Sequence, residues 1–171
     1  MNHPYLAMNL TQSDRILRTI AGLCLSAVGI ALVSQHIFGM APCAWCVLQR
    51  LILLAIAAVC GLAGTGWGKV IVLRLGAAIA TILSICGVVA AWYQYSVASN
   101  SFSCAQTFAD RFIAGSGLDA AVPWLFGIYA SCADARVELL GIEYSIWGLI
   151  LFIVCAALAL SVLASRRPQQ G

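Results

Sequence analysis

The second apolar stretch of the chain covers residues 46–64 and reads CVLQRLILLAIAAVCGLAG, in which Arg50 is the single charged residue. Its length matches the ~20 residues with which a helix crosses the hydrocarbon core of a bilayer. A segment surrounded by lipid has no water to bond its backbone, so it must satisfy its own N–H and C=O groups as an α-helix. The stretch therefore predicts a membrane-spanning helix.

Three more stretches of this kind lie at residues 16–34, 71–95 and 144–164. Over the 171 residues, 63% are hydrophobic and 9% are charged, whereas soluble domains carry about 25% charged residues. We expect an all-α membrane protein in which four transmembrane helices pack as a bundle. No linker or repeat divides residues 1–171, so a single integral membrane domain is expected. Its first helix is expected to be retained, because no convincing signal-cleavage site follows it.

Basic residues of the short connections predict how the bundle is oriented. They are Arg15, Arg18, Lys69, Arg74, Arg166 and Arg167. All of these lie at one end of the predicted bundle, which the positive-inside rule assigns to the cytoplasm together with both termini. The other end carries a short loop at residues 35–45 and a long loop at residues 99–143, in which two arginines stand against five acidic residues. The net charge of +3 includes no long basic run, so no nucleic-acid partner is expected.

The eight cysteines divide by their depth in the predicted bundle. Inside the spans are Cys24, Cys60, Cys86 and Cys155, and at the outward end are Cys43, Cys46, Cys104 and Cys132. The inner four are expected to pack as small apolar groups. The outward four would face the periplasm of a bacterium or the equivalent lumen of a eukaryotic organelle, where disulfides persist. Redox chemistry is therefore possible at the outward end.

Cys43 and Cys46 form a Cys-x-x-Cys motif at the outward mouth of the second span, directly after Pro42. Proline is tolerated in the first turn of a helix, so the two cysteines are expected to open this helix and to share one side at i and i+3. A close pair at a helix N-terminus can form and reopen a disulfide, because that environment favours the thiolate. The motif predicts a redox-active pair.

Two other interpretations of the outward cysteines stay open. The four sulfurs could bind zinc or another soft metal, or they could form two static disulfides that brace the loop. Zinc sites usually combine two closely spaced pairs, whereas Cys104 and Cys132 stand 28 positions apart. The spacing favours redox chemistry over a metal site.

Several motifs together make the chain resemble the DsbB family over nearly its whole length. They are Gln35-His36, the run from Pro42 to Arg50 (PCAWCVLQR), Cys132-Ala133-Asp134 and Leu140-Gly141-Ile142-Glu143. The resemblance implies a thiol:quinone oxidoreductase of the bacterial inner membrane, with its cysteine pairs facing the periplasm. It implies a DsbA-like thioredoxin-fold oxidase as the partner and a membrane quinone, ubiquinone or menaquinone, as the electron acceptor.

The resemblance also implies a role for each outward cysteine. The thiolate of the partner would attack a Cys104–Cys132 disulfide at Cys104. The Cys43–Cys46 disulfide would then reoxidise this loop pair, for which the loop must bring a sulfur to the mouth of the second span. Cys46 would be the sulfur nearer the quinone.

Three residues are expected at the quinone site. Arg50 follows Cys46 by one helical turn, where its charge favours the thiolate and could stabilise negative charge on the quinone, unless the side chain reaches to the headgroups instead. His36 could bond a quinone carbonyl or simply lie at the interface. Tyr95 takes the place of a histidine of the family, just as Gln49 replaces an acid before the arginine. These replacements are expected to alter quinone affinity or quinone type rather than the thiol relay.

Residues 122–130 are nearly all apolar but too short to span a membrane. We expect this segment either to lie along the membrane interface or to pack on the helix ends. A vitamin K epoxide reductase-like enzyme is the competing resemblance, since it also joins four helices, a Cys-x-x-Cys motif and quinone chemistry. In that family the loop cysteines precede the motif, whereas here Cys43 and Cys46 come first.

Overall fold

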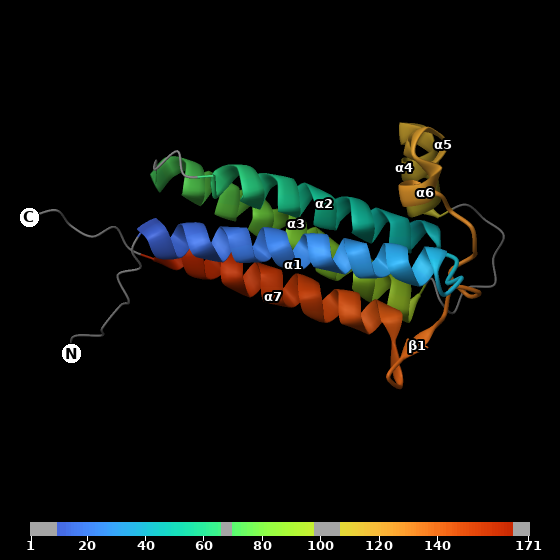
Figure 1. Ribbon diagram of the computed structural model, residues 1–171. Coiled ribbons are helices and arrows are strands. Elements are labelled where there is room, and N and C mark those ends of the chain that lie inside the picture. Colours follow the sequence, from blue (N-terminus) through green and yellow to red (C-terminus); the bar gives the residue numbers. More distant parts are fainter. Residues whose placement is uncertain (1–9, 66–69, 98–106, 166–171) are drawn as a thin grey trace, which may run out of the picture.

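The computed structural model describes residues 10–65, 70–97 and 107–165. Its four long helices are α1 (Leu10–His36), α2 (Ala44–Ala63), α3 (Val70–Ser96) and α7 (Tyr144–Ala164). They run alongside one another as a bundle, and α1 begins at the end of the bundle where α7 finishes (Figure 1). Each is long and apolar enough to cross a membrane. The prediction of an all-α protein with four transmembrane helices is confirmed.

The helix bounds follow the apolar stretches closely except at the start of α1. This helix begins at Leu10 rather than near residue 16, so its first turns are polar. Asp14 and Arg18 form an ion pair one turn apart on this extension. Such i,i+4 pairs stabilise a helix outside the hydrocarbon region, where hydrophobicity gives no signal. The extra turns therefore extend α1 beyond its apolar stretch.

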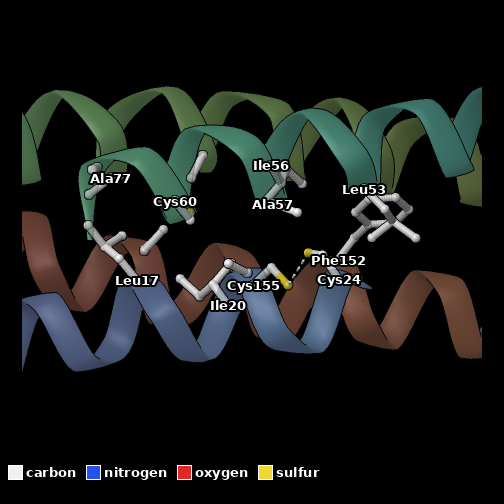
Figure 2. Close-up of a cluster of buried hydrophobic side chains, with 14 of the residues drawn as sticks. Leu17, Ile20, Cys24, Leu53, Ile56, Ala57, Cys60, Ala77, Phe152 and Cys155 are labelled. Atoms are coloured by element: carbon white, nitrogen blue, oxygen red, sulfur yellow. Dashed lines mark hydrogen bonds between the residues drawn. The ribbon is translucent and has the colours of Figure 1, made fainter. Parts of the chain in front are cut away.

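The interior of the bundle is built from apolar side chains of all four helices (Figure 2). Its fully buried members include Leu17, Ile20, Cys24, Ile56, Cys60, Ala77, Phe152 and Cys155. The Sγ atoms of Cys24 and Cys155 lie 3.8 Å apart. These cysteines and Cys60 pack in the core as expected, but Cys86 is exposed on the outer surface of α3. Because α3 packs through another face, Cys86 would contact lipid instead of the core.

Short elements cover the outward end of the bundle. They are α4 (Phe108–Ser116), α5 (Leu118–Ala121), α6 (Pro123–Phe126) and a hairpin of β1 (Glu138–Leu139) and β2 (Ile142–Glu143). Thr107 and Asp110 form a capping box that begins α4. The hairpin turns at Leu140 and Gly141, both with positive φ, as a tight turn between antiparallel strands requires. Figure 1 shows α4, α5 and α6 to one side of the start of α2 and the hairpin at the start of α7.

A second apolar cluster holds this outward layer against the start of α2. It includes Ala109 and Ile113 of α4 and Phe126 of α6, packed with Cys43 and Val47. Within residues 122–130, Phe126 is buried whereas Trp124 and Tyr129 are exposed. The segment therefore packs on the helix ends, and a position along the membrane interface stays a prediction for its exposed rings.

Gly87 tests a close contact between α3 and α7. A Cβ atom added there would lie 2.3 Å from the ring of Phe152. We predict that Gly87→Ala destabilises the bundle by about 1–3 kcal/mol, because the ring has to move within a packed core. Thermal unfolding in detergent measures the change.

Gly29→Ala is the matched control, since a Cβ on this exposed helical glycine meets nothing within 4 Å. It should be neutral or slightly stabilising, because alanine has the higher helix propensity. Equal behaviour of the two variants would contradict the packing of α3 on α7 described above.

Candidate redox site

Cys43 and Cys46 lie where the sequence predicts them, at the start of α2. Cys43 is the N-cap residue with an extended backbone, and the N–H of Val47 donates to its carbonyl at 3.0 Å. Cys46 follows in the first helical turn. Their Sγ atoms are 3.1 Å apart, about 1 Å more than a disulfide bond. A small rotation of the side chains would bring the two sulfurs to bonding distance.

Cys132 of the long outward loop meets this pair. The backbone N–H groups of Tyr129 and Ala130 both donate to the carbonyl of Pro42, at 3.0 and 3.3 Å. These bonds hold the segment before Cys132 against the residue before Cys43, and the Cys132 side chain packs against the cluster that contains Cys43. Cys132 therefore lies beside the Cys-x-x-Cys pair at the mouth of α2.

The contact between Cys43 and Cys132 shifts the pKa values of the two thiols in opposite directions. Hydrogen bonds to Cys132 and Cys46, together with complete burial, raise the pKa of the Cys43 thiol well above its usual value. The hydrogen bond from Cys43 lowers the pKa of Cys132. Among reduced thiols the proton thus stays on Cys43, and Cys132 is the better nucleophile because only the thiolate attacks a disulfide.

A cavity of about 260 Å³ lies beside the sulfurs, between α1, α2, α7 and the segment that follows Cys132. Its walls are mostly apolar, with Ala31, Met40, Leu53, Val137 and Leu151 among the lining residues. Cys46 and Arg50 reach it from α2, and Ser145 reaches it from α7. The cavity therefore combines an apolar interior with a sulfur, a cation and a hydroxyl.

Arg50 is only 4% exposed and is held inside the bundle. It donates to the side chain of Gln35 at 3.0 Å and to the carbonyl of Leu125. Its Nε and the Oγ of Ser145 are buried without a hydrogen-bond partner among the described residues. A buried polar atom without a partner costs about 1–3 kcal/mol, so these two atoms suit a bound molecule that carries oxygen acceptors.

The other two predicted quinone residues do not line the cavity. His36 is exposed, and its Nε2 lies 3.0 Å from the carbonyl oxygen of Trp124. Tyr95 packs on the neighbouring ring of Trp92, with centroids 6.1 Å apart. Neither side chain lies at the cavity beside Cys46. Their roles at the quinone stay predictions.

Cys104 lies outside the described residues, so the pairing of Cys104 with Cys132 also stays a prediction. The same holds for a metal site built from all four outward cysteines. Among the described residues alone, no three His, Cys, Asp or Glu side chains gather as metal ligands.

Sequence reasoning missed three polar residues at the site. Ser145 lines the cavity, Gln35 holds Arg50, and Gln94 of α3 reaches the sulfurs of the Cys-x-x-Cys pair. The signal for Gln94 is a glutamine within an apolar span, since such a side chain must find partners inside the bundle. Nothing in the local pattern of Ser145 distinguishes it from a surface serine at a helix start.

Comparison with known proteins agrees with this geometry. The family model for disulfide bond formation protein DsbB matches residues 13–162. Disulfide bond formation protein B of Pseudomonas syringae pv. tomato is 32% identical over 152 residues, covering 87% of this chain and 88% of that protein. The protein of the same name from Herminiimonas arsenicoxydans is 30% identical, covering 86% and 92%.

A third relative is disulfide bond formation protein B 1 of Pseudomonas putida, 31% identical over 92% of this chain and 95% of its own length. The match extends over all four long helices and over the outward loops between them. With its Cys-x-x-Cys motif at the mouth of α2 and Cys132 against it, the chain belongs to the DsbB family of disulfide bond formation proteins.

Proposed function

We propose that this membrane protein reoxidises a DsbA-like thioredoxin-fold oxidase of the periplasm and passes the electrons to a membrane quinone. One observation supports the proposal: three cysteines and an arginine follow one another from the outward loop into the bundle. Cys132 contacts Cys43, Cys43 lies 3.1 Å from Cys46, and Cys46 lines an apolar cavity together with Arg50. Such a row suits the transfer of a disulfide from the membrane to a soluble partner.

The first exchange takes place on the outward loop. A thiolate of the reduced partner attacks Cys104 of a Cys104–Cys132 disulfide, which forms a mixed disulfide and releases Cys132 as a thiolate. The second thiol of the partner then attacks the mixed disulfide. The partner leaves with its own disulfide, and Cys104 and Cys132 are left reduced.

The second exchange takes place at the mouth of α2. The Cys132 thiolate attacks Cys43, the Cys43–Cys46 bond breaks, and its electron pair goes to the Cys46 sulfur. Cys104 then attacks Cys132, which restores the loop disulfide and leaves Cys43 and Cys46 reduced. The position of Cys132 beside Cys43 favours this attack.

The residues of the cavity fit a quinone headgroup. A bound quinone would supply an acceptor for two electrons and two protons. Arg50 offers a buried N–H donor and a positive charge, Ser145 offers a hydroxyl, and the remaining walls are mostly apolar. These residues would orient ring oxygens and exclude water beside Cys46.

The energetics of the partner also favour a lipid-phase oxidant. DsbA has a reduction potential of about −120 mV, whereas glutathione pools in oxidising compartments lie at about −180 mV or lower. A gap of about 60 mV costs roughly 3 kcal/mol for a two-electron transfer, so glutathione disulfide cannot reoxidise such a partner efficiently. We therefore infer a bacterial inner-membrane location with the outward end in the periplasm.

Turnover with a soluble partner tests the function. The lipid-reconstituted protein is given a reduced DsbA-like oxidase and ubiquinone or menaquinone, and quinone reduction is followed. We predict that Cys104→Ser abolishes turnover because the partner then has no loop disulfide to attack. Cys86→Ser, on the outer face of α3, is the control and should keep the wild-type rate.

Full turnover by the Cys104→Ser variant would refute the scheme. Stoichiometric zinc bound by thiolates in the wild type, without quinone reduction, would support the metal-binding interpretation instead.

Arg50 tests the acceptor site separately from the thiol exchange. We predict that Arg50→Met raises the KM for quinone about 10- to 100-fold, because a hydrogen bond to a charged group contributes about 1.5–3 kcal/mol. Stoichiometric oxidation of the partner by the fully oxidised protein, measured without quinone, should stay largely intact. Loss of that stoichiometric step with an unchanged KM would contradict a role for Arg50 at the quinone.

A further inference from the structure

Gln94, in the last turn of α3, donates to the sulfurs of the Cys-x-x-Cys pair from inside the bundle. Its Nε2 lies 3.2 Å from Cys46 Sγ and 3.7 Å from Cys43 Sγ. The side chain is 6% exposed and also lines the cavity beside Cys46. A buried amide in an apolar bundle is costly unless it is hydrogen-bonded. The orientation of the Gln94 amide should therefore be fixed by its hydrogen-bond partners.

Gln49 of α2 fixes that direction. Its Nε2 donates to Gln94 Oε1 at 2.6 Å, and Gln49 is itself only 8% exposed. With its oxygen occupied by Gln49, the amide of Gln94 presents N–H groups to the sulfurs. If the amide of Gln94 were reversed, its N–H groups would face the N–H donor of Gln49, and its oxygen would point at the sulfurs, where it could not stabilise a thiolate.

α7 leaves space for this arrangement at Gly148. A Cβ atom added to Gly148 would lie 2.8 Å from Gln49 Oε1. Side chains from α2 and α3 and a glycine of α7 therefore hold one amide pair in place. Three helices contribute to a contact that ends on the Cys46 sulfur.

We propose that Gln94 is a catalytic residue that stabilises negative charge on Cys46 when the Cys43–Cys46 disulfide opens, and that Gln49 is the positioning residue that aims it. The inference rests on the proposed function for the reaction that opens this bond. When a thiolate attacks Cys43, the S–S electron pair goes to Cys46, where the N–H of Gln94 receives it as a hydrogen bond. Gln94 transfers no proton and changes no oxidation state.

The amide at position 49 has a consequence specific to this chain. An ionised carboxylate there could only accept hydrogen bonds, so it would attract the N–H groups of Gln94 and turn its oxygen toward the sulfurs. A glutamine avoids this reversal and adds no charge to the interior. The amide of Gln49 and the N–H donor of Gln94 therefore act together.

Alkylation of the fully reduced protein tests this without partner or quinone. Iodoacetamide reacts with thiolates, and mass spectrometry locates the label on Cys46. We predict that Gln94→Met, which keeps the size but removes the donor, slows labelling of Cys46 about 3- to 10-fold at neutral pH. A tenfold loss of thiolate is partly offset by the higher nucleophilicity of a more basic thiol. The deficit should vanish at alkaline pH, where the thiol is ionised in both proteins.

Two variants separate positioning from general damage. Gln49→Met should give a smaller deficit, and the double variant should match Gln94→Met alone, because Gln49 acts through Gln94. Thr81→Val removes a buried hydroxyl of α3 that bonds only within its own helix to the carbonyl of Ala77, and it should label like the wild type.

A wild-type labelling profile in Gln94→Met, or additive deficits in the double variant, would overturn the proposal. If Gln94→Met does not fold, Gln49→Met decides: a neutral-pH deficit that disappears at alkaline pH supports the proposal, and a wild-type profile overturns it. Failure of wild-type turnover with partner and quinone would instead refute the proposed function, because the labelling needs neither.

Discussion

The junction at Pro42 is the interaction on which the outward end depends. Its carbonyl accepts hydrogen bonds from Tyr129 and Ala130, and the residue after it caps α2 as Cys43. The hydrogen bonds thereby join the loop before α2 to the loop after α3, next to the reactive cysteine pair. Without this junction Cys132 would have no fixed relation to Cys43. The apolar packing of α4 and α6 on the start of α2 supports the same contact from the side.

Inside the bundle, buried polar side chains, and not cysteines alone, mark the redox site. Cys24, Cys60 and Cys155 are buried among apolar side chains of the core. Around Cys46, in contrast, Arg50, Gln49, Gln94 and Ser145 are all nearly buried. Polar groups are expensive at such positions unless they are bonded or used. Their concentration at one end of one cavity distinguishes a reactive cysteine pair from cysteines that only fill space.

Much of this arrangement could be predicted from the sequence. Hydrophobicity over ~20 residues locates a transmembrane helix, and the four spans were found in this way. Pro42 and the i, i+3 spacing predicted that Cys43 and Cys46 would open α2, and the single charge of that helix pointed to Arg50. Each of these signals is local, which is why it can be read from a short stretch of chain.

Other features depend on contacts that no local pattern encodes. The polar start of α1 is held by an ion pair, and the outward face of Cys86 follows from how α3 packs. Gln94 meets Cys46 only because α3 returns beside α2. His36 contacts the carbonyl of Trp124, which belongs to a different loop. These positions are set by tertiary packing.

A cross-link between Cys43 and Cys132 tests whether the disulfide passes from the Cys-x-x-Cys pair to the loop through these two sulfurs. In a Cys46→Ser/Cys104→Ser protein treated with a mild oxidant, the account predicts rapid formation of a Cys43–Cys132 disulfide, identified by mass spectrometry of unreduced peptides. A Cys43→Ser/Cys104→Ser protein should form the Cys46–Cys132 link far more slowly. Failure of Cys43 and Cys132 to pair, or equal pairing of Cys132 with Cys46, would contradict the transfer route described here.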